Sequence, residues 1–334
     1  DRATTFIYML SQHDSLPISG SRRTPSLQLS RMSPVLQKQN PLNHDVIVNV
    51  NGVLTRRSEA RVSPFDSSVQ NGDAVWEGLR VYDGRIFRLR EHLARLRRSA
   101  MALAYVSIPS DEEIIAEVRR TLEANGMRDG VHIRLTLSRG EKYTSGLDPR
   151  INTAGHTLIV LAEHKPPVYD KTGIRLATAA HRRPPSDVLD QKIHSCNQLT
   201  SILAKLEANA AGADDALLLD TRGFIAETNA THLFFVEDGR IRTPTTAACP
   251  EGITRSVILE LCRAHDVPCD EADVTLAEAY RADEVFCTGT MGEIAPVIEI
   301  DGRQIGGGGM GAITSRLAEH FGKLTTEEGE RVVG

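Results

Sequence analysis

The sequence predicts an α+β protein with two domains. Its 334 residues suffice for two hydrophobic cores of ordinary size, and its first half reads as hairpins combined with helices. Pro166 and Pro167 together can continue neither a central strand nor a helix interior, so we expect a linker at 165–172. A smaller α/β domain at 43–164 and a larger domain at 173–334 would flank this linker.

Residues 1–42 differ from the rest of the chain. Serine, arginine, glutamine and proline are frequent there, apolar periodicity is absent, and acidic residues are few. Arginine and serine without acid are typical of a transit peptide, but the amphipathic pattern of such a peptide is missing. We therefore expect 1–42 to be a disordered or non-native leader, with Met32 as the natural start and 1–31 outside the fold.

The composition excludes several classes of function. The chain is 40% hydrophobic and 25% charged with a net charge of −5, as expected of a soluble globular protein. No basic run is interleaved with aromatics, so we expect no nucleic-acid partner. No apolar run approaches the roughly 18 residues of a membrane span. Five cysteines without Cys-x-x-Cys spacing predict neither disulfides nor a metal site, which favours a reducing, cytoplasmic location.

Three kinds of sequence signal predict the strands and helices of the first half: the apolar pattern, turn dipeptides and a helix-capping motif. Asn51-Gly52 accepts the backbone of a tight turn and predicts a hairpin over 46–54, and Asp83-Gly84 predicts a second strand pair over 81–89. Ser110 followed by Glu113 is a capping box, which starts a helix at 111–124. The remaining elements are a helix from residue 91, with Leu93, Leu96, Ala100 and Leu103 on one face, and strands at 132–137 and 157–162.

The second half alternates strands with amphipathic helices. A helix to about residue 211 carries the apolar pattern Leu199, Ile202, Leu203, Leu206 and Ala210. The other expected helices begin at about 255, 276 and 312. The expected strands are 174–179, 216–219, 233–236, 284–287 and 294–300, and Gly306–Gly309 are expected to form a mobile loop.

A polar stretch, Asp190–Gln198, lies just ahead of the helix that contains Leu199 and includes a candidate catalytic residue. It contains Lys192, one of only seven lysines against thirty-two arginines, so an ordinary surface cation of this chain would be an arginine. A lysine, unlike an arginine, can lose its proton and attack a carbonyl carbon to form a Schiff base. A solvated loop lysine is the alternative, and other stretches must decide between the two.

Three further stretches supply what a phosphorylated cofactor needs. Gly252-Ile253-Thr254 precedes a helix, so amide groups, a hydroxyl and the positive end of a helix dipole converge on one spot suited to phosphate. Thr288–Gly292 offers similar donors after a strand. Glu227 is a carboxylate in an apolar hairpin, where a pyridinium nitrogen could serve as its partner. A reactive lysine, a phosphate site and such a carboxylate are what pyridoxal 5′-phosphate requires.

The chain resembles the class IV, branched-chain aminotransferase-like family of pyridoxal-phosphate enzymes over roughly residues 45–325. The matching pieces are Trp76–Tyr82, Glu91–Leu96, Arg134 before Arg139-Gly140, Lys192, Glu227, Gly252–Arg255 and Thr288–Ile294. The resemblance implies a two-domain fold type IV enzyme. Its smaller α/β domain would be followed by a larger domain with a mixed, barrel-like sheet and helices.

The family also implies roles for individual residues. Lys192 would be the catalytic, Schiff-base lysine, and Glu227 would face the pyridine nitrogen. Further cofactor-binding residues would be Arg95, Asn197, Gly252, Ile253, Thr254, Thr290 and Met291. Residues of the substrate pocket would be Trp76, Arg80, His132 and Arg134, with the arginines taking a substrate carboxylate. The resemblance further implies a homodimer.

Some positions depart from the family pattern. His232 stands where asparagine is usual, Pro250 where an aliphatic residue is usual, and Asn71 where an aromatic is usual. The tyrosine often found soon after the lysine is absent, and we expect Asn197 to donate to the ring oxygen in its place. These departures concern the substrate more than the cofactor.

The expected function is therefore a transaminase that moves an amino group between an aliphatic, branched-chain-like L-amino acid and 2-oxoglutarate. The alternatives are an (R)-amine or D-amino acid transaminase and an aminodeoxychorismate-type lyase. The usual Lys-His-Leu-Asn-Arg stretch of the lyase is absent after Lys192. A non-catalytic relative that kept the fold is the remaining hypothesis, and retention of both Lys192 and Glu227 argues against it.

Overall fold

The structure is a computed structural model that describes residues 39–334. The leader and the start at Met32 expected from the sequence therefore lie largely outside the described residues. The described residues belong to one compact unit, so the division into domains at 43–164 and 173–334 stays a prediction. This part of the chain is built on two sheets, and the predicted linker runs from the sixth strand of the chain, in the first sheet, to the seventh, in the second.

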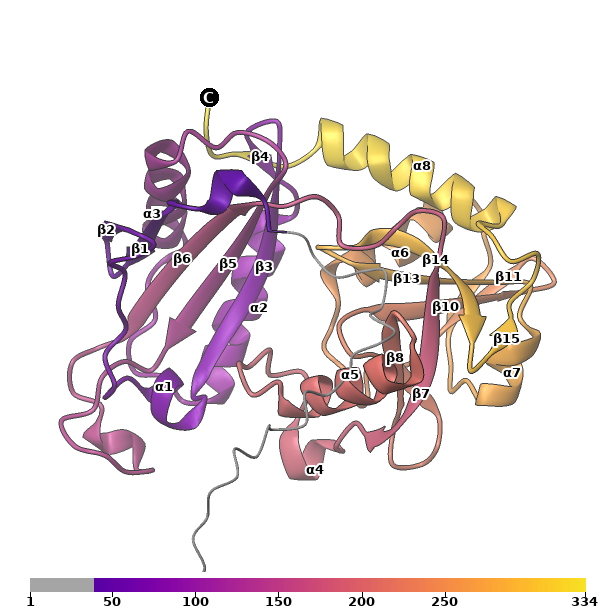
Figure 1. The fold of residues 1–334 in the computed structure, drawn as a ribbon, viewed down its shortest axis with the longest axis horizontal. Coiled ribbons are helices and arrows are strands. Elements are labelled where there is room, and N and C mark those ends of the chain that lie inside the picture. The colour runs from indigo at the N-terminus through magenta and orange to yellow at the C-terminus, as the bar shows by residue number, and fades with distance from the viewer. Residues whose placement is uncertain (1–38) are drawn as a thin grey trace, which may run out of the picture. The chain divides into compact units, whose positions relative to one another are not determined.

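The first sheet has seven strands, all antiparallel to their neighbours, in the order β16-β4-β3-β5-β6-β1-β2. One edge strand comes from the chain's C-terminal end, which returns beside β4 (Figure 1). Sequence analysis did not predict that edge strand. The strands are β1 (Ile47–Val50), β2 (Val53–Arg56), β3 (Ala74–Tyr82), β4 (Arg85–Ile86), β5 (Val131–Ser138), β6 (Thr157–His164) and β16 (Glu330–Arg331).

Two helices pack on this sheet through a single core. They are α2 (Leu89–Ala102) and α3 (Asp111–Ala124), and α3 has both the predicted bounds and the predicted capping box. Leu96 of α2 and Val118 of α3 share the core with Leu79 and Ile133 of the central strands. Shorter elements beside the sheet are η1 (Pro41–Asn43), α1 (Ser67–Asn71) and η2 (Pro149–Ile151). The second predicted strand pair is shorter than expected, because α2 already begins at Leu89.

The register of the central strands separates two sets of side chains. Leu79 lies opposite Ile133, and both point into the core under the helices. The alternate residues point to the other face, because successive side chains of a strand point to opposite sides. Arg80 is thus paired with His132, and Gly78 with Arg134. Residues expected at the substrate pocket therefore gather on one face of the sheet.

The second sheet has nine strands in mixed directions. Its order is β12-β11-β10-β13-β14-β7-β8-β9, with β15 paired to β14, and the parallel pairs are β11 with β12, β14 with β7 and β7 with β8. The strands are β7 (Ile174–Arg182), β8 (Asp215–Leu219), β9 (Ile225–Thr228), β10 (His232–Glu237), β11 (Arg240–Thr243), β12 (Cys269–Glu271), β13 (Glu284–Gly289), β14 (Glu293–Ile300) and β15 (Arg303–Gln304).

The helices of this half pack on the second sheet in two places. Phe234 and Phe286 of the sheet stack within a core that includes Ile258 of α6 and Leu317 of α8. The helix α5 packs on β7 and β8 through small residues, among them Ala204. The helices are α4 (Ser186–Leu189), α5 (Leu199–Ala211), α6 (Ile253–Ala264), α7 (Leu276–Arg281) and α8 (Ala312–Glu327).

The orientation of α5 differs from what its large apolar residues suggest. Leu199, Ile202 and Leu206 are 60%, 54% and 58% exposed, while Ala204 and Ala208 are buried. The reason is close packing, because only alanines let the helix lie so near the sheet residues Ala216 and Leu218. Large apolar side chains consequently form a stripe on the outer face of α5.

No helix among residues 39–334 is long and apolar enough to cross a membrane. In the same part of the chain, no cluster of three or more histidine, cysteine or acidic side chains is arranged to hold a metal ion.

The start of α8 depends on a carboxylate from another element. Glu284 of β13 accepts hydrogen bonds from the backbone N–H groups of Ile313 and Thr314, at 3.1 and 2.8 Å, and from the Thr314 hydroxyl at 2.7 Å. These amides belong to the first turn of a helix, where no helical partner exists for them. Gly311 has no room for a Cβ, because the Glu284 side chain fills that space.

We expect Glu284→Ala to lower the free energy of unfolding by about 1–2 kcal/mol, since the first turn of α8 loses its cap. Urea denaturation monitored by circular dichroism would measure this loss. The control is Glu319→Ala on the same helix, where the exposed carboxylate pairs with Lys323 at 3.0 Å and no measurable change is expected. Equal denaturation midpoints for the two variants would contradict the capping role.

Candidate active site

A cavity of about 270 Å³ brings together residues from both sheets. Trp76 and Gly78 of β3 and Arg95 of α2 contribute from the first half of the chain. Glu227 of β9 and the first residues of α6 contribute from the second half, as does the loop between β13 and β14. Most of the residues expected to bind a cofactor therefore surround one space, although they lie up to about 200 positions apart.

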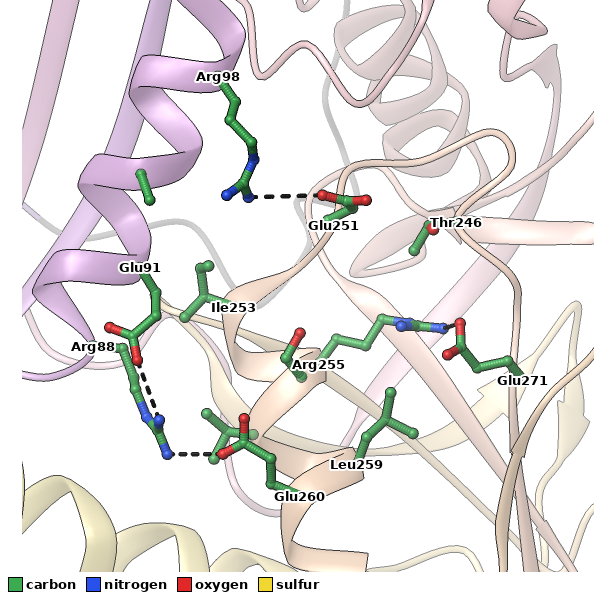
Figure 2. Close-up of a pocket in the computed structure, with 13 residues that line it drawn as sticks. Arg88, Glu91, Arg98, Thr246, Glu251, Ile253, Arg255, Leu259, Glu260 and Glu271 are labelled. Carbon is green, nitrogen blue, oxygen red and sulfur yellow. Dashed lines mark hydrogen bonds and ion pairs between the residues drawn. The ribbon is translucent and has the colours of Figure 1, made fainter.

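A larger hollow of about 430 Å³ opens beside the start of α6, and it is lined mainly by charged side chains (Figure 2). Its best-enclosed cations are already matched with carboxylates. Arg88 pairs with Glu91 and Glu260 at 3.2 and 2.8 Å, and Arg255 pairs with Glu271 at 2.6 Å. A space whose charges are balanced internally offers little to a charged ligand, so the smaller cavity is the candidate site.

One side of the smaller cavity is suited to phosphate. The helix α6 begins at Ile253 after Gly252, and no side chain caps its first N–H groups. The hydroxyl of Thr288 is buried without a hydrogen-bond partner among the described residues. Gly252 has no room for a Cβ because the ring of His232 fills the space, so the backbone itself lines the cavity here. Free amides at a helix N-terminus together with an unsatisfied hydroxyl form an anion site.

Glu227 lies on another side of the cavity and is almost completely buried. Its Oε1 is 2.9 Å from Nε of Arg183, yet the two groups are not aligned for a hydrogen bond, and both atoms lack one among the described residues. Burial raises the pKa of Glu227 to about 7, against the opposing charges of Arg183 and Arg95. The site thus holds a buried carboxylate whose Oε1 is short of a hydrogen-bond donor although Arg183 lies close to it.

A buried ion cluster supports the base of the cavity. Glu77 accepts bonds from Arg95 Nε and Nη2 at 2.8 and 2.7 Å, and its Oε2 lies 2.7 Å from Nδ1 of His92. Burial raises the pKa of Glu77, but the charge of Arg95 and the hydrogen bonds outweigh that effect and hold the pKa well below its usual value. Arg95 also donates to the Glu251 carbonyl at 2.8 Å. Arg95 therefore lines the cavity with its charge already balanced by Glu77.

The structure brings eight of the thirteen predicted site residues to the cavity, and five lie elsewhere. Those at the cavity are Trp76, Arg95, Glu227, Gly252, Ile253, Thr254, Thr290 and Met291. Those that do not line it are Arg80, His132, Arg134, Lys192 and Asn197.

The structure corrects the expected position of Lys192. Its side chain is exposed and does not line the cavity. The residue sits in a turn in which Asp190 accepts hydrogen bonds from the N–H groups of Lys192 and Ile193, at 2.9 and 3.1 Å. The turn directs the lysine to the surface, and His194 reaches the cavity instead. Asn197 is also exposed, so the expected contact with a ring oxygen has no support in this geometry.

The predicted substrate residues Arg80, His132 and Arg134 are likewise displaced from the cavity. Arg134 stacks on Trp76, with its guanidinium carbon 3.5 Å from the ring centre, and donates to the Cys196 sulfur at 3.7 Å. Arg80 lies 3.7 Å from Glu293 and donates to the Lys165 carbonyl at 3.3 Å. Burial and the nearby cations lower the pKa of His132 to about 3. None of the three lines the cavity.

Sequence reasoning missed several residues that do line the cavity. They are Lys165, Val168, Tyr169, His194, Ala230 and Thr231, besides His232 and Pro250, which were noted only as departures from the family pattern. Gly292 belongs to the glycine-containing stretch after a strand, and its Cβ would collide with the ring of Tyr169. The sequence could have indicated Lys165 as a candidate site residue, because lysines are rare in this chain.

His194 is held by several contacts. Its carbonyl accepts from the Trp76 N–H and its N–H donates to the Ser99 hydroxyl, both at 3.0 Å. Its ring stacks on Trp76 with 4.5 Å between centres, and Nδ1 lies 2.6 Å from the Trp76 carbonyl oxygen. Because a carbonyl only accepts, Nδ1 carries the hydrogen in that bond. Burial and the charge of Arg95 lower the pKa of His194, although Glu77 opposes them, which favours the neutral ring.

Known proteins are similar to this chain over most of its length. The branched-chain-amino-acid aminotransferase-like protein 2 of Arabidopsis thaliana is 49% identical over 319 residues, which are 95% of this chain and 55% of that protein. A D-alanine aminotransferase of Bacillus licheniformis is 33% identical over 273 residues, covering 80% of this chain and 93% of that one. The chain also spans 60% of the length of a second Arabidopsis protein of the first kind, so it corresponds to little more than half of these plant relatives.

Solved structures agree with this fold. The crystal structure of a T.th. branched-chain amino acid aminotransferase complexed with N-(5′-phosphopyridoxyl)-L-glutamate has a TM-score of 0.79 at 34% identity, covering 85% of this chain and 95% of that one. That similarity confirms the predicted fold type IV architecture. The amino-transferase class IV family model matches residues 74–300. The chain therefore belongs to the class IV aminotransferases, a family of pyridoxal-phosphate-dependent enzymes.

Proposed function

We propose that this chain binds pyridoxal 5′-phosphate in the cavity and transfers amino groups between aliphatic, branched-chain-like L-amino acids and 2-oxoglutarate. The observation that carries the proposal is the meeting of three features in one cavity. They are the anion site at the start of α6, the buried and under-paired Glu227, and an unpaired lysine, Lys165.

The first two features suit the cofactor's phosphate and ring. Free amides at Ile253 and Thr254, together with the Thr288 hydroxyl that lines the same cavity, would hold the phosphate by charge-assisted hydrogen bonds. Glu227 would accept a hydrogen bond from a protonated ring nitrogen, which supplies the donor that its Oε1 lacks among the described residues. When bound, the cofactor's protonated ring accepts the electrons released as a substrate Cα–H bond breaks.

The third feature suits a substrate carboxylate. Lys165 lines the cavity, and its ammonium group has no hydrogen bond or ion pair among residues 39–334. A lysine at a partly enclosed site favours a bound carboxylate over a neutral group. Trp76 and Met291 offer apolar surface to an aliphatic side chain. In this proposal, Lys165 takes the role that the sequence suggested for Arg80 and Arg134.

A D-amino acid transaminase is the second candidate, supported by the 33% identity to a D-alanine aminotransferase. The relatives named as branched-chain enzymes and the phosphopyridoxyl-L-glutamate complex of the 34% identical enzyme favour the L series. An (R)-amine substrate would have no carboxylate for Lys165. An aminodeoxychorismate-type lyase is disfavoured because its usual stretch is absent after Lys192.

A cytoplasmic location is part of the proposal. All five cysteines of the chain lie within the described residues, and all are free thiols. Buried thiols that stay unpaired are typical of a reducing compartment.

We also propose a homodimer. The stripe of Leu199, Ile202 and Leu206 on α5 is more than half exposed, with Val188 close by in the sequence. A contiguous row of exposed large apolar side chains is typical of an interface. Two copies of this stripe could face each other across a two-fold axis, as self-complementary interfaces do.

The substrate proposal predicts the effect of removing the Lys165 charge. With L-leucine or L-valine as donor and 2-oxoglutarate as acceptor, Lys165→Met should raise KM by about tenfold or more, since a charged hydrogen bond contributes about 1.5–3 kcal/mol. D-alanine and (R)-1-phenylethylamine should be poorer donors for the parent. Lys323→Met on α8 is the matched control and should leave KM unchanged. If the amine were the best donor, or Lys165→Met kept its KM, the carboxylate assignment would be wrong.

Glu227→Gln tests the ring contact. The variant should still bind the cofactor but react more slowly with an amino donor, because a neutral amide stabilises a protonated ring nitrogen less than a carboxylate does. Each 1.4 kcal/mol of lost transition-state stabilisation would appear as about a tenfold slower half-reaction in stopped flow. Unchanged rates would leave Glu227 with a structural role only.

The same variant has a readout that needs no cofactor. The pKa of Glu227 in the native protein, about 7, lies above that of the unfolded chain, so the native state retains a proton that the unfolded state loses. The contribution of Glu227 to stability is therefore full at low pH and falls as the pH rises from about 4.5 to 7. Denaturation of cofactor-free parent and Glu227→Gln across this range should show a steeper loss in the parent, and parallel curves would contradict the raised pKa.

The dimer proposal predicts that Ile202→Asp in the α5 stripe shifts the protein to a monomer, because a charge would have to be buried in the interface. Light scattering at micromolar concentration measures the mass. Val106→Asp is the control, since Val106 is 95% exposed in a loop away from the stripe, and it should leave the dimer intact. A monomeric parent would remove the proposal.

A further inference from the structure

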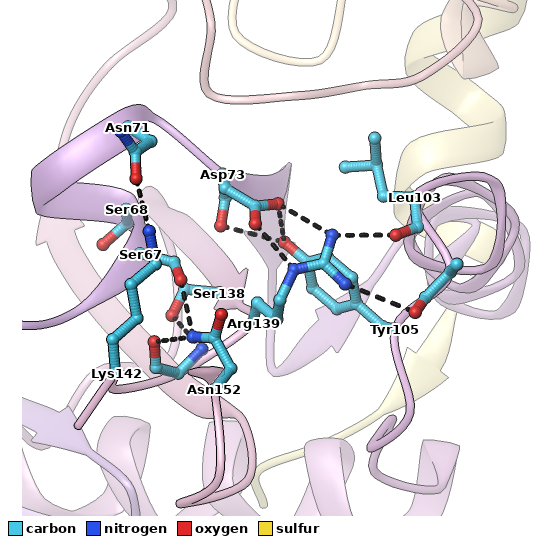
Figure 3. A network of polar contacts seen from close by, with 12 residues as sticks. Ser67, Ser68, Asn71, Asp73, Leu103, Tyr105, Ser138, Arg139, Lys142 and Asn152 are labelled. Carbon is cyan, nitrogen blue, oxygen red and sulfur yellow. Dashed lines mark hydrogen bonds and ion pairs between the residues drawn. The ribbon is translucent and has the colours of Figure 1, made fainter. Parts of the chain in front are cut away.

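The lysines of the described chain leave few candidates for a covalent link to a cofactor. Six of the seven lie among residues 39–334, and four of these are engaged elsewhere. Lys142 is buried in a polar network, where it donates to Asn71 (Figure 3) and to the Gly146 carbonyl. Lys171, Lys205 and Lys323 each pair with an acidic residue. The two that remain are the exposed Lys192 and the cavity residue Lys165, and the proposed function assigns the Lys165 ammonium group to the substrate carboxylate.

The backbone keeps Lys192 out of the cavity. Residues 194–196 lie along an edge of β3, where Ser195 forms an antiparallel bridge with Val75 and the Cys196 N–H donates to the Ala74 carbonyl at 2.7 Å. This register fixes His194 at the position from which a side chain reaches the cavity. Bringing Lys192 there would require a two-residue slip that breaks these bonds and the stacking of His194 on Trp76.

His194 is equipped to exchange a proton at this position. Its Nδ1 is committed to the Trp76 carbonyl, so in the neutral ring Nε2 carries the lone pair. Nε2 has no hydrogen bond to any residue between 39 and 334, and the ring borders the cavity together with Glu227. A neutral imidazole with one nitrogen anchored and the other open is the usual form of a general base.

We propose that His194 takes the proton-transfer role that the sequence suggested for Lys192, and that the cofactor is bound without a covalent link to the chain. The inference rests on the proposed function. Nε2 of His194 would accept the proton that leaves the substrate Cα, and the bound cofactor would supply the electron acceptor. The electron pair of the broken bond stays within the substrate and cofactor, so no further reactant is needed.

The test compares the full-length parent with Lys192→Ala, His194→Gln and His194→Lys. Each protein is incubated with pyridoxal 5′-phosphate, treated with borohydride and digested, and peptide mass spectrometry locates any pyridoxyl group. In the parent and in Lys192→Ala, no pyridoxyl peptide is expected, and dialysis should remove the cofactor. His194→Lys should gain a pyridoxyl group on residue 194, because an amine then replaces the imidazole that borders the cavity together with Glu227.

Stopped flow with L-leucine separates proton transfer from binding. His194→Gln should bind the cofactor with about the parent's affinity and lose roughly a hundredfold or more in the half-reaction rate, as expected when a general base is removed. Lys192→Ala should keep the parent's rate. A merely structural role for His194 would instead weaken cofactor binding and leave the rate of the bound complex unchanged, which would overturn the inference.

Other outcomes also decide the matter. A borohydride adduct on Lys192 or Lys165 of the parent would overturn the inference while leaving the proposed transaminase intact. Parent rates in His194→Gln would do the same. If neither the parent nor His194→Lys bound the cofactor, the proposed function itself would fail and the inference with it.

Discussion

The buried contact of Glu77 with Arg95 is the constraint on which the site depends. A carboxylate removed from water is costly unless it is matched by charge and by several hydrogen bonds, and here two arginine nitrogens and a histidine supply them. The same guanidinium reaches the Glu251 carbonyl just before α6. One ion pair therefore connects β3, α2 and the loop that leads into the anion site.

The pair also accounts for the position of His194. Its Nδ1 lies 3.5 Å from Glu77 and 2.6 Å from the Trp76 carbonyl, so the ring sits between a buried negative group and a backbone acceptor. Removal of Arg95 would leave Glu77 unpaired in the interior, and such changes usually cost about 3–5 kcal/mol. The shape of the cavity, the packing of α2 on β3 and the tautomer of His194 would then change together.

Local signals in the sequence predicted the local parts of the structure, and the errors at the site have a common physical cause. The capping box at Ser110 marked the start of α3, because it depends on residues adjacent in the chain. The C-terminal strand β16 was missed, because a two-residue edge strand pairs with distant residues and carries no periodicity of its own. Whether Lys192 or His194 faces the cavity is likewise decided by a distant contact, the bridge between Ser195 and Val75. Spacing in the sequence identifies candidate residues, while tertiary register decides which of them reach the ligand.

The absence of a lysine from the position of His194 also changes what the rest of the cavity must do. A covalent link holds a cofactor at high effective concentration, and without it the affinity must come from non-covalent contacts alone. The tight packing of Gly252 against His232, and of Gly292 against Tyr169, suits that demand, because rigid backbone donors lose little entropy on binding.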